Sequence, residues 1–408
     1  MQMAYALAAL CCLAVGGRGV AADWPQWRGP ERNGVSREEA WLKHWPANTV
    51  PRVAWRASLG KGHSAAAVRN GRVFTMGWDG AQDTVFCFDA ASGRLIWRQS
   101  YPCRSILQWT GPRATPTVEE DTVYTLGQHG QLQAWDSVTG ARRWQVLLPE
   151  SYNPDADYGF AWSPLIEGPL LLLGCGRTGL ALHKHDGSYA WGHDGQPGAC
   201  ASPVPFTLEG KRGVVLVGMG PGRNSVLLVG VEPGNGRALW PPQPWPEKWG
   251  AMGADILVHG RSFFVSTAEQ HKRCARFTWR DGRLAEDWSN ASLSTYTSGI
   301  VLLGGHLYGV DKSGLLKCVE WETGRERWSQ RGFGEHGTLM AAAGKLLVQT
   351  GHSGELVVAS AQTDGYHELR RHKVFVGDPA TFTPPVLADG RIYCRSYRGE
   401  FVCLDLSQ

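Results

Sequence analysis

The chain carries little net charge for its length. Among its 408 residues, 41 lysines and arginines nearly balance 37 aspartates and glutamates, which leaves a net charge of +4. Proteins that bind nucleic acid or an anionic membrane surface by electrostatic attraction concentrate far more positive charge. We therefore expect no nucleic-acid partner and no electrostatic attachment to a membrane.

Long hydrophobic runs are scarce as well. The run near the N-terminus, residues 4–15, is about a dozen residues long, whereas a membrane-spanning helix needs roughly 20. It is followed by Val20-Ala21-Ala22, whose small residues are typical of a signal-peptidase site. We predict that residues 1–22 are a signal peptide and that cleavage precedes Asp23. The mature chain is then periplasmic or secreted, soluble rather than lipid-anchored, and without a transmembrane span.

The cysteine motifs that bind haem or zinc are missing. The sequence contains no C-x-x-C-H and no paired C-x-x-C, which argues against covalently attached haem and against a zinc framework. Its adjacent cysteines, Cys11 and Cys12, lie in the predicted signal peptide. The eight cysteines that follow are dispersed along the chain.

Two of these cysteines are candidates for a disulfide. With Arg398-Gly399 as a two-residue hairpin turn, Cys394 would lie directly opposite Cys403 in a non-hydrogen-bonded pair. An oxidising compartment would favour a bond between them. The alternative is two small core thiols, because Cys403 shares its place in the sequence repeat described next with Cys87 and Cys318. The sequence leaves both alternatives open.

What the chain does have is a row of aromatic residues at nearly fixed intervals of 40 to 49 residues. A period of this size indicates one supersecondary unit per repeat, stacked on its neighbours until a continuous core forms. The row consists of Trp55, Trp97, Trp144, Trp191, Trp240, Trp288, Trp328 and, in the next position, Phe375.

The sequence around each tryptophan follows one pattern. Clear copies are VYTLGQHGQLQAWDSVTGARRW, which ends at Trp144, and LYGVDKSGLLKCVEWETGRERW, which ends at Trp328. The pattern predicts two alternating strands, a tight turn and a short strand that carries the tryptophan. In that turn an acid stands eight residues before the tryptophan and a glycine four before it. We expect the acid to cap the turn and the glycine to adopt positive φ. The acids are Asp89, Asp136, Glu232 and Glu320, and the glycines are Gly93, Gly140, Gly187, Gly236 and Gly324.

A further short apolar strand precedes each unit, so the repeat predicts four antiparallel strands, the blade of a β-propeller. The last unit, from Pro384, ends after its third strand, while the strand around Trp55 has no blade before it. Joining the two ends predicts an eight-bladed, all-β propeller over residues 51–408, closed by an N-terminal strand, with no exposed sheet edge. An open solenoid is the alternative.

Residues 23–50 are rich in tryptophan and proline and too few for a domain of their own. We predict that this segment packs across one face of the propeller with Trp24, Trp27, Trp41 and Trp45 in the crevices between blades. A mobile partner-binding arm is the alternative.

The repeat resembles the pyrroloquinoline-quinone (PQQ)-type propeller repeat, approximately V-Y-V-G-S-x-D-G-x-L-Y-A-L-D-A-x-T-G-x-x-x-W, over about residues 51–406. The opening Asp23-Trp24-Pro25-Gln26-Trp27-Arg28-Gly29-Pro30 is similar to that of many exported bacterial proteins of this superfamily. The resemblance implies one of two functions. Quinoprotein alcohol dehydrogenases are enzymes, whereas the scaffold lipoprotein of the outer-membrane β-barrel assembly machinery is not.

For an enzyme, the resemblance implies a quinone on the propeller axis, a Ca²⁺ ion, a carboxylate base and stacking aromatics. The candidates lie where one blade connects to the next. Asp155, Asp157 and Asp255 are candidate catalytic residues, and Asp155, Asp157 and Glu247 are candidate metal ligands. Arg113, Trp109, Trp162, His63 and His336 are candidate cofactor-binding residues.

Each candidate also has a structural explanation, because such aspartates commonly cap turns and such histidines commonly pack in loops. The recognised catalytic features do not form one constellation in the sequence. We therefore favour a monomeric binding or scaffolding module that contacts an envelope or periplasmic protein. The alternative is a PQQ- and Ca²⁺-dependent dehydrogenase that oxidises an alcohol or sugar.

Overall fold

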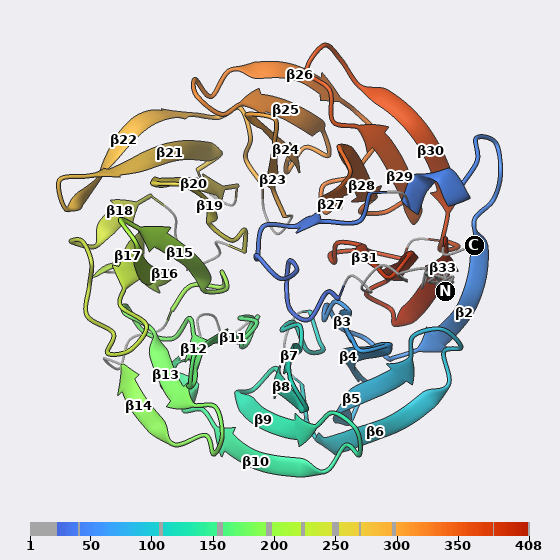
Figure 1. The fold of residues 1–408 in the computed structure, drawn as a ribbon, viewed down its shortest axis with the longest axis horizontal. Coiled ribbons are helices and arrows are strands. Elements are labelled where there is room, and N and C mark those ends of the chain that lie inside the picture. Colours follow the sequence, from blue (N-terminus) through green and yellow to red (C-terminus); the bar gives the residue numbers. More distant parts are fainter. Residues whose placement is uncertain are drawn as a thin grey trace, which may run out of the picture.

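A computed structural model of the chain shows eight β-sheets arranged around a central axis (Figure 1). Each sheet contains a four-stranded antiparallel blade, so the predicted eight-bladed propeller is confirmed. The structure describes residues 23–39, 41–105, 109–152, 158–192, 198–221, 225–246, 253–268, 271–295, 299–377 and 379–406. Within this part of the chain no helix is long and apolar enough to cross a bilayer.

The first four blades follow one another along the chain, and each runs from the axis to the rim. Blade 1 contains β3 (Ala67–Arg69), β4 (Arg72–Trp78), β5 (Gln82–Asp89) and β6 (Leu95–Pro102). Blade 2 contains β7 (Thr117–Glu119), β8 (Thr122–Leu126), β9 (Gln131–Asp136) and β10 (Arg142–Leu147). Blade 3 contains β11 (Leu165–Glu167), β12 (Leu170–Leu173), β13 (Leu180–His183) and β14 (Tyr189–Gly192). Blade 4 contains β15 (Val204–Leu208), β16 (Lys211–Met219), β17 (Val226–Val231) and β18 (Gln243–Trp245).

The other four blades complete the ring. Blade 5 contains β19 (Leu257–His259), β20 (Ser262–Thr267), β21 (Arg273–Arg280) and β22 (Arg283–Asn290). Blade 6 contains β23 (Val301–Leu303), β24 (His306–Val310), β25 (Leu316–Glu320) and β26 (Glu326–Gln330). Blade 7 contains β27 (Thr338–Ala342), β28 (Lys345–Gln349), β29 (Glu355–Ser360) and β30 (His367–Lys373). Blade 8 contains β31 (Val386–Ala388), β32 (Arg391–Arg395), β33 (Glu400–Asp405) and β2 (Arg52–Ser58). Short 3₁₀ helices span Trp41–His44 and Glu150–Tyr152.

Blade 8 is built from both ends of the folded chain. Its outermost strand, β2, pairs antiparallel with β33, from Arg52 opposite Asp405 to Ser58 opposite Glu400. The pairing joins residues that are almost the whole fold apart in sequence. In blade 8, β2 occupies the outermost position that β6 occupies in blade 1, so the N-terminal strand completes the four strands of the last blade.

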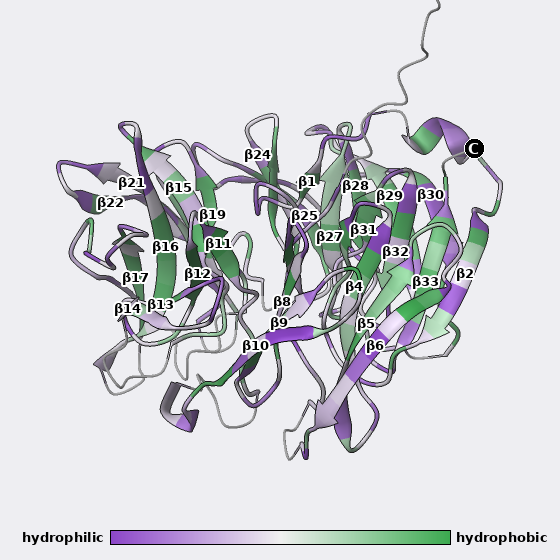
Figure 2. Ribbon diagram, turned by 60° about the horizontal axis from the view of Figure 1, so that its bottom comes forward, coloured by the Kyte–Doolittle hydropathy of each residue, from purple (hydrophilic) through white to green (hydrophobic). Residues whose placement is uncertain are grey.

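The apolar core lies between the blades. Middle strands are buried along most of their length, as in β16, whereas outer strands alternate buried and exposed residues, as in β6. Figure 2 shows this difference as mainly green middle strands and outer strands of mixed colour. Sheets that are covered on both faces need apolar residues on both, and stacking blades around a ring provides that cover.

The repeated tryptophans join neighbouring blades. The Trp55 indole N–H donates to Ala90 O (3.0 Å), and that of Trp97 donates to Ser137 O (3.1 Å), in each case in the turn of the following blade. The same bond is made by Trp144, Trp191, Trp288 and Trp328. The glycine of that turn has positive φ, as predicted, with Gly93 at 70°. It also lies against the ring, since a Cβ at Gly93 would be 2.4 Å from Trp55 Cγ.

Two positions of the aromatic row differ from the prediction. Trp240 precedes the outer strand β18 and donates to Leu228 O of its own blade (3.2 Å). In the following blade, blade 5, the corresponding turn is the short Asp281-Gly282 hairpin, which is too narrow to accept the Trp240 indole N–H. In blade 7, Arg370 rather than Phe375 pairs with β29 at the tryptophan position, opposite Val358. Equal spacing placed the position too late, because the connection from β26 to β27 is short and brings this position of blade 7 closer to Trp328.

Of the two alternatives for Cys394 and Cys403, the structure shows two core thiols and not an opposed pair. Cys394 lies opposite Val402 and Cys403 opposite Tyr393, one residue away from the expected register, so the two thiols belong to opposite faces of the sheet. The turn causes the shift, because Ser396 N donates to Glu400 O and encloses a longer loop than two residues. Both cysteines are free thiols in the core. Cys403 pairs with Trp55, just as Cys87 and Cys318 pair with Trp97 and Trp328.

Residues 23–39 form a strap that contacts all eight blades. Trp24 pairs with Val68 of blade 1, and Pro25 O accepts from Val118 N of blade 2 (2.8 Å). The remaining contacts are those of Arg32 with blades 3 and 4, Trp27 with blade 5, Arg28 with blade 6, β1 (Val35–Ser36) with β27 of blade 7, and Glu38 with Gly390 of blade 8. Figure 1 shows the strap in blue across the centre of the ring.

A buried carboxylate lies at the contact between blades 1 and 2. Asp83 is fully buried on β5 and accepts a hydrogen bond from Gln128 Nε2 (2.7 Å). Gln128 is itself fully buried and accepts from Gly111 N (3.1 Å). Burial raises the pKa of Asp83 above its ordinary value, because the interior disfavours the charged form more than these bonds favour it.

This carboxylate should make stability depend on pH. Because the pKa of Asp83 is higher in the folded chain than in the unfolded chain, stability should fall as pH rises from the ordinary aspartate value through the raised one. Asp83→Asn should lack this fall, whereas Asp281→Asn, at an exposed hairpin, should keep it. Urea midpoints measured from acidic to neutral pH test the prediction. Parallel curves for Asp83→Asn and the unaltered protein would contradict it.

Candidate functional site

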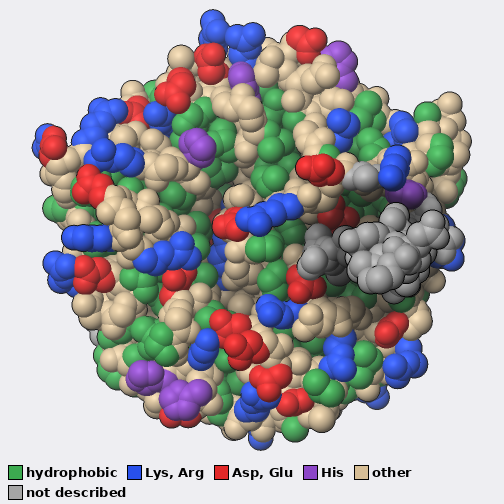
Figure 3. Space-filling model, in the orientation of Figure 1, with side chains coloured by type: hydrophobic (Ala, Val, Ile, Leu, Met, Phe, Trp, Pro, Cys, Tyr) green, Lys and Arg blue, Asp and Glu red, His purple; other side chains and the backbone are tan. Residues whose placement is uncertain are grey.

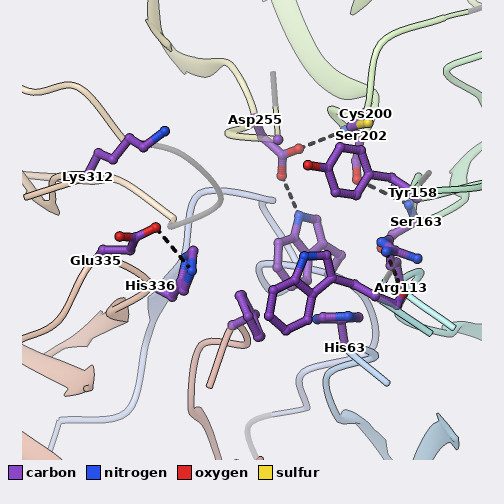
Figure 4. A pocket seen from close by; sticks show the side chains of 15 residues that line it. His63, Arg113, Tyr158, Ser163, Cys200, Ser202, Asp255, Lys312, Glu335 and His336 are labelled. Atoms are coloured by element: carbon purple, nitrogen blue, oxygen red, sulfur yellow. Dashed lines mark hydrogen bonds and ion pairs between the residues drawn. The ribbon is translucent and has the colours of Figure 1, made fainter. Parts of the chain in front are cut away.

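The loops that enter the inner strands surround a cavity of about 280 Å³ on the propeller axis. Every blade contributes to it, and the strap contributes Trp27. Figure 4 shows Arg113, Tyr158, Ser163, Cys200 and Ser202 on one side and Lys312, Glu335 and His336 on the other. The complete lining is Trp27, His63, Trp109, Arg113, Tyr158, Ala161, Ser163, Cys200, Ser202, Gly253, Asp255, Lys312, Glu335, His336 and Phe382. We call this cavity the axial pocket.

One side of the axial pocket is a cluster of aromatic rings from blades 7, 8, 1 and 2. Phe382 is at its centre, with ring centroids 4.4 Å from His336, 4.9 Å from His63 and 5.2 Å from Trp109. Tyr397 packs behind it, 4.9 Å from His63 and 5.5 Å from Trp109. Rings in such edge-to-face and tilted contact hold one another in place, so this wall is a firm apolar surface.

The other side is a ladder of hydrogen bonds between the entrances of neighbouring blades. Ala65 N donates to Thr115 Oγ1 (3.0 Å), and Thr115 N donates to Ser163 Oγ (2.9 Å). Ser163 N donates to Ser202 Oγ (3.1 Å), and Ser202 N donates to Asp255 Oδ1 (2.7 Å). The hydroxyl or carboxylate at each inner-strand entrance thus accepts the backbone N–H of the blade before it. The ladder fixes blades 1 to 5 relative to one another.

Asp255 ends the ladder and connects it to the strap. Its second oxygen, Oδ2, accepts the indole N–H of Trp27. The buried guanidiniums of Arg28 and Arg32 interact electrostatically with this carboxylate. Asp255 is itself buried, 6% exposed. Both of its oxygens therefore accept hydrogen bonds that hold the strap and blade 4 in place.

The two imidazoles of the pocket are neutral at neutral pH. Burial, together with the nearby Arg113 and Arg395 guanidiniums, lowers the pKa of His63 well below its ordinary value. Burial also lowers the pKa of His336, although Glu335 lies 3.4 Å away and opposes the shift. A neutral imidazole can accept as well as donate a hydrogen bond, so neither ring adds positive charge to the site.

Arg113 is held at the edge of the pocket. Its Nη2 donates to Trp109 O (2.6 Å), and its guanidinium carbon lies 5.7 Å from the centroid of the Tyr158 ring. The planar guanidinium presents several N–H donors in fixed directions, which suits a carboxylate.

The structure brings five of the candidate residues together in the axial pocket, namely His63, Trp109, Arg113, Asp255 and His336. Trp162 is not among them. Its side chain is fully buried in the core beside Phe160 and donates to Ala199 O, because it points away from Ser163 on the alternating strand entrance. Asp155, Asp157 and Glu247 lie outside the described residues.

Sequence reasoning did not single out several residues of the pocket. Phe382 and Glu335 lie in segments with no distinctive pattern, and Lys312 lies in the first turn of a clear repeat copy, where it looks like an ordinary turn residue. The hydroxyls Ser163 and Ser202 did leave a signal, since each stands just before a proline at the start of an inner strand in WSP and ASP. Trp27 could be found only once the strap was placed, because its contact with Asp255 joins residues 228 positions apart.

The described residues of the axial pocket do not form a site for Ca²⁺. They contain no group of three or more histidines, cysteines, aspartates and glutamates placed to hold a metal ion. Ca²⁺ needs six to eight oxygen ligands, usually with several carboxylates, whereas Asp255 is occupied and Glu335 is paired with His336. The aromatic wall and Arg113 would suit a planar anion, but the cation that accompanies a quinone cofactor does not fit this part of the chain.

Fold and pocket together define a PQQ-like β-propeller with an axial pocket. The chain belongs to the family described as outer membrane protein assembly factor BamB, whose family model matches residues 47–193 and 104–330, together more than half of its length. No curated protein matches the chain.

Solved structures of the same fold include both classes of protein. BamB from Moraxella catarrhalis is 15% identical, with a TM-score of 0.62 and coverage of 88% of this chain and 98% of its own. The quinohemoprotein alcohol dehydrogenase from Comamonas testosteroni is 13% identical, with a TM-score of 0.61 and coverage of 95% and 81%. ADHIIG of Pseudomonas putida HK5, also a quinohemoprotein alcohol dehydrogenase, is 14% identical, with a TM-score of 0.57 and coverage of 95% and 80%. At these identities the likeness shows the fold alone.

Proposed function

We propose that the protein is an exported binding and scaffolding propeller that contacts another protein in the cell envelope. The observation that carries this proposal is the state of Asp255, because this candidate base of the described pocket accepts hydrogen bonds on both oxygens, from the Trp27 indole N–H and from Ser202 N. Membership of the BamB family supports the same function. The predicted signal peptide supports export, and the ring, which is closed by pairing of β2 with β33, suits a monomer.

Surface chemistry is consistent with a protein partner. Figure 3 shows acidic and basic side chains interspersed over one face, without a broad area of one sign. Such a surface gives no general attraction to polyanions, so recognition would depend on shape and on individual polar contacts.

The alternative is a PQQ- and Ca²⁺-dependent dehydrogenase acting on an alcohol or sugar. It is favoured by one observation, namely that Trp109, Arg113 and His63 line one cavity on the axis. Stacking on an aromatic face and a guanidinium for a carboxylate are groups that a quinone would use.

Titration of the purified mature chain with pyrroloquinoline quinone and Ca²⁺ distinguishes the two functions. For a scaffold we expect no saturable change in tryptophan fluorescence and no rise in the melting temperature up to about a hundredfold molar excess, since only a ligand of the folded state stabilises it. Saturable binding with a raised melting temperature would overturn the scaffold proposal.

A further inference from the structure

The turn between β13 and β14 of blade 3 departs from the pattern of the sequence repeat. Eight residues before the repeated tryptophan, at the place of the capping acid, blade 3 has His183. The residues at this place in other blades are carboxylic acids, namely Asp89, Asp136, Glu232 and Glu320. An imidazole cannot take over their role as an ionised acceptor of backbone N–H groups.

The turn keeps its shape because another acid caps it. Gly187 N donates to His183 O (2.8 Å), which is the same backbone bond that closes the turns of blades 1 and 2. Asp186, three residues after His183, accepts from Ser188 N (2.9 Å) and from Ser188 Oγ (2.7 Å). The cap has therefore moved along the turn, and the imidazole at the first position has no part in it.

A second imidazole lies beside the first. The ring centroids of His183 and His185 are 5.9 Å apart, with 64° between the ring planes. Two imidazoles that hold one tetrahedral ion through their nitrogens have centroids roughly 5 Å apart, so small rotations of the side chains bring both rings onto one ion. His183 is half-buried, and the His185 side chain is 73% exposed, so an ion can reach them from solvent.

The backbone between the two histidines is fixed on both sides. Lys184 N donates to Pro169 O (3.0 Å), and Lys184 O accepts the indole N–H of Trp144 of blade 2 (3.0 Å). The Lys184 ammonium is paired with the carboxylate of Glu119, also of blade 2. Little conformational freedom is therefore left to lose when an ion binds, and the positive charge nearest to the pair along the chain is offset.

Neighbouring carboxylates define how many ligands the protein supplies. Asp186 Oδ2 lies 3.1 Å from His185 Nε2. A carboxylate in this place accepts the N–H of an imidazole and leaves its other nitrogen for a metal. Glu167 lines a groove together with His183, but its oxygens are bonded to Arg212 (2.6 and 3.0 Å). The part of the chain that the structure describes offers no group of three or more ligating side chains, so two imidazoles are the complete protein contribution.

We propose that His183 and His185 form a two-histidine site for a divalent transition-metal ion, with water in the remaining positions and Asp186 as the residue that orients His185. Imidazole is a ligand for Zn²⁺, Ni²⁺ and Cu²⁺, among which Cu²⁺ generally binds most tightly. The site belongs to the outer half of blade 3, toward the rim of the ring (Figure 1). It is separate from the axial pocket, and the inference goes beyond the scaffold function without depending on it.

Isothermal titration with Zn²⁺ tests the proposal on the mature chain, purified without a histidine tag and freed of metal. We expect saturable binding at one site. His183→Gln and His185→Gln should each weaken this binding at least about tenfold, since even the loss of a residue that only orients a ligand costs 10- to 100-fold. Circular dichroism verifies that each variant is folded, and if one fails to fold, the other still removes a ligand.

Two further variants locate the binding. His367→Gln is the matched control, because His367 also lies beside a carboxylate, Asp364 at 3.2 Å, and it should bind Zn²⁺ as the unaltered protein does. His352→Gln should do the same, although the ring of His352 is 5.7 Å from that of His336. Electron paramagnetic resonance of bound Cu²⁺ should show two nitrogen ligands in the unaltered protein and one in His183→Gln.

Four results would overturn the proposal. They are no saturable Zn²⁺ binding, unchanged binding by His183→Gln or His185→Gln, loss of binding in His352→Gln or His367→Gln instead, and a single nitrogen ligand on Cu²⁺ in the unaltered protein. Each of these results would leave the scaffold proposal intact, because that proposal is tested separately by the titration with pyrroloquinoline quinone and Ca²⁺.

Discussion

Arg32→Met should lower the free energy of unfolding by about 3 kcal/mol, because buried carbonyl oxygens that lose their donor cost roughly 1–3 kcal/mol each. The Arg32 guanidinium is 2% exposed and donates to Ser163 O (3.2 Å), Pro203 O (2.9 Å) and Pro164 O. Methionine fills much of the same volume but donates nothing. Burial lowers the pKa of Arg32 only to about 10, so the side chain is charged at neutral pH and the substitution also removes this charge.

Urea unfolding followed by circular dichroism measures the loss. Arg37→Met, on a strap residue whose side chain is 81% exposed, is the matched control and should change stability by less than about 0.5 kcal/mol. Limited proteolysis should also show faster cleavage within residues 23–39 of Arg32→Met, because the strap loses its contacts with blades 3 and 4. Equal stability of the two variants would contradict the structural importance of the strap.

Gly93→Ala should destabilise the protein by about 2–4 kcal/mol through two separate effects. Gly93 has φ of 70°, which disfavours a residue with a side chain. In addition, the new Cβ would lie 2.4 Å from Trp55 Cγ, so the tryptophan that joins blade 8 to blade 1 would have to move. The second effect should be the larger, because the ring is buried between two blades.

Gly71 supplies the comparison that separates the two effects. It has nearly the same φ, 71°, but a Cβ there would meet nothing within 4 Å. Gly71→Ala should therefore show only the backbone cost, roughly 1 kcal/mol. Thermal and urea unfolding of both variants give the difference. If the two variants lose equal stability, the contact between Trp55 and Gly93 adds nothing to blade packing.

The fold could be predicted from the sequence because the turn-and-tryptophan pattern that specifies a blade is local and repeated. Four copies of the turn show both the acid and the glycine before the tryptophan, and Asp136 caps its turn by accepting from Thr139 N (2.8 Å), as expected. The prediction failed where one turn was longer than the pattern assumed. A single extra residue in a hairpin exchanges the two faces of a strand, and this is what separated Cys394 from Cys403.

The site was less accessible to sequence reasoning, because its residues come from loops that meet only when the ring is complete. His63, Arg113 and His336 could be suggested from their places at the entrances to blades. Their roles could not be predicted, because the hydrogen bonds that run from Ala65 to Asp255 join residues that are neighbours in space and not in sequence. Trp162 illustrates the limit, because one step along an extended strand moved its side chain from the pocket into the core.

The order in which the chain is made has a consequence for how it folds. The strap and β2 leave the ribosome before any complete blade, but β2 cannot complete its sheet until β33, more than 340 residues later, has been made. Contacts between such distant parts of a chain form slowly. Until then the first segment exposes Trp41, Trp45 and Trp55, all of which are buried in the finished ring. Closure of the ring therefore waits for the last strand of blade 8, and until then the growing chain exposes apolar surface that favours aggregation.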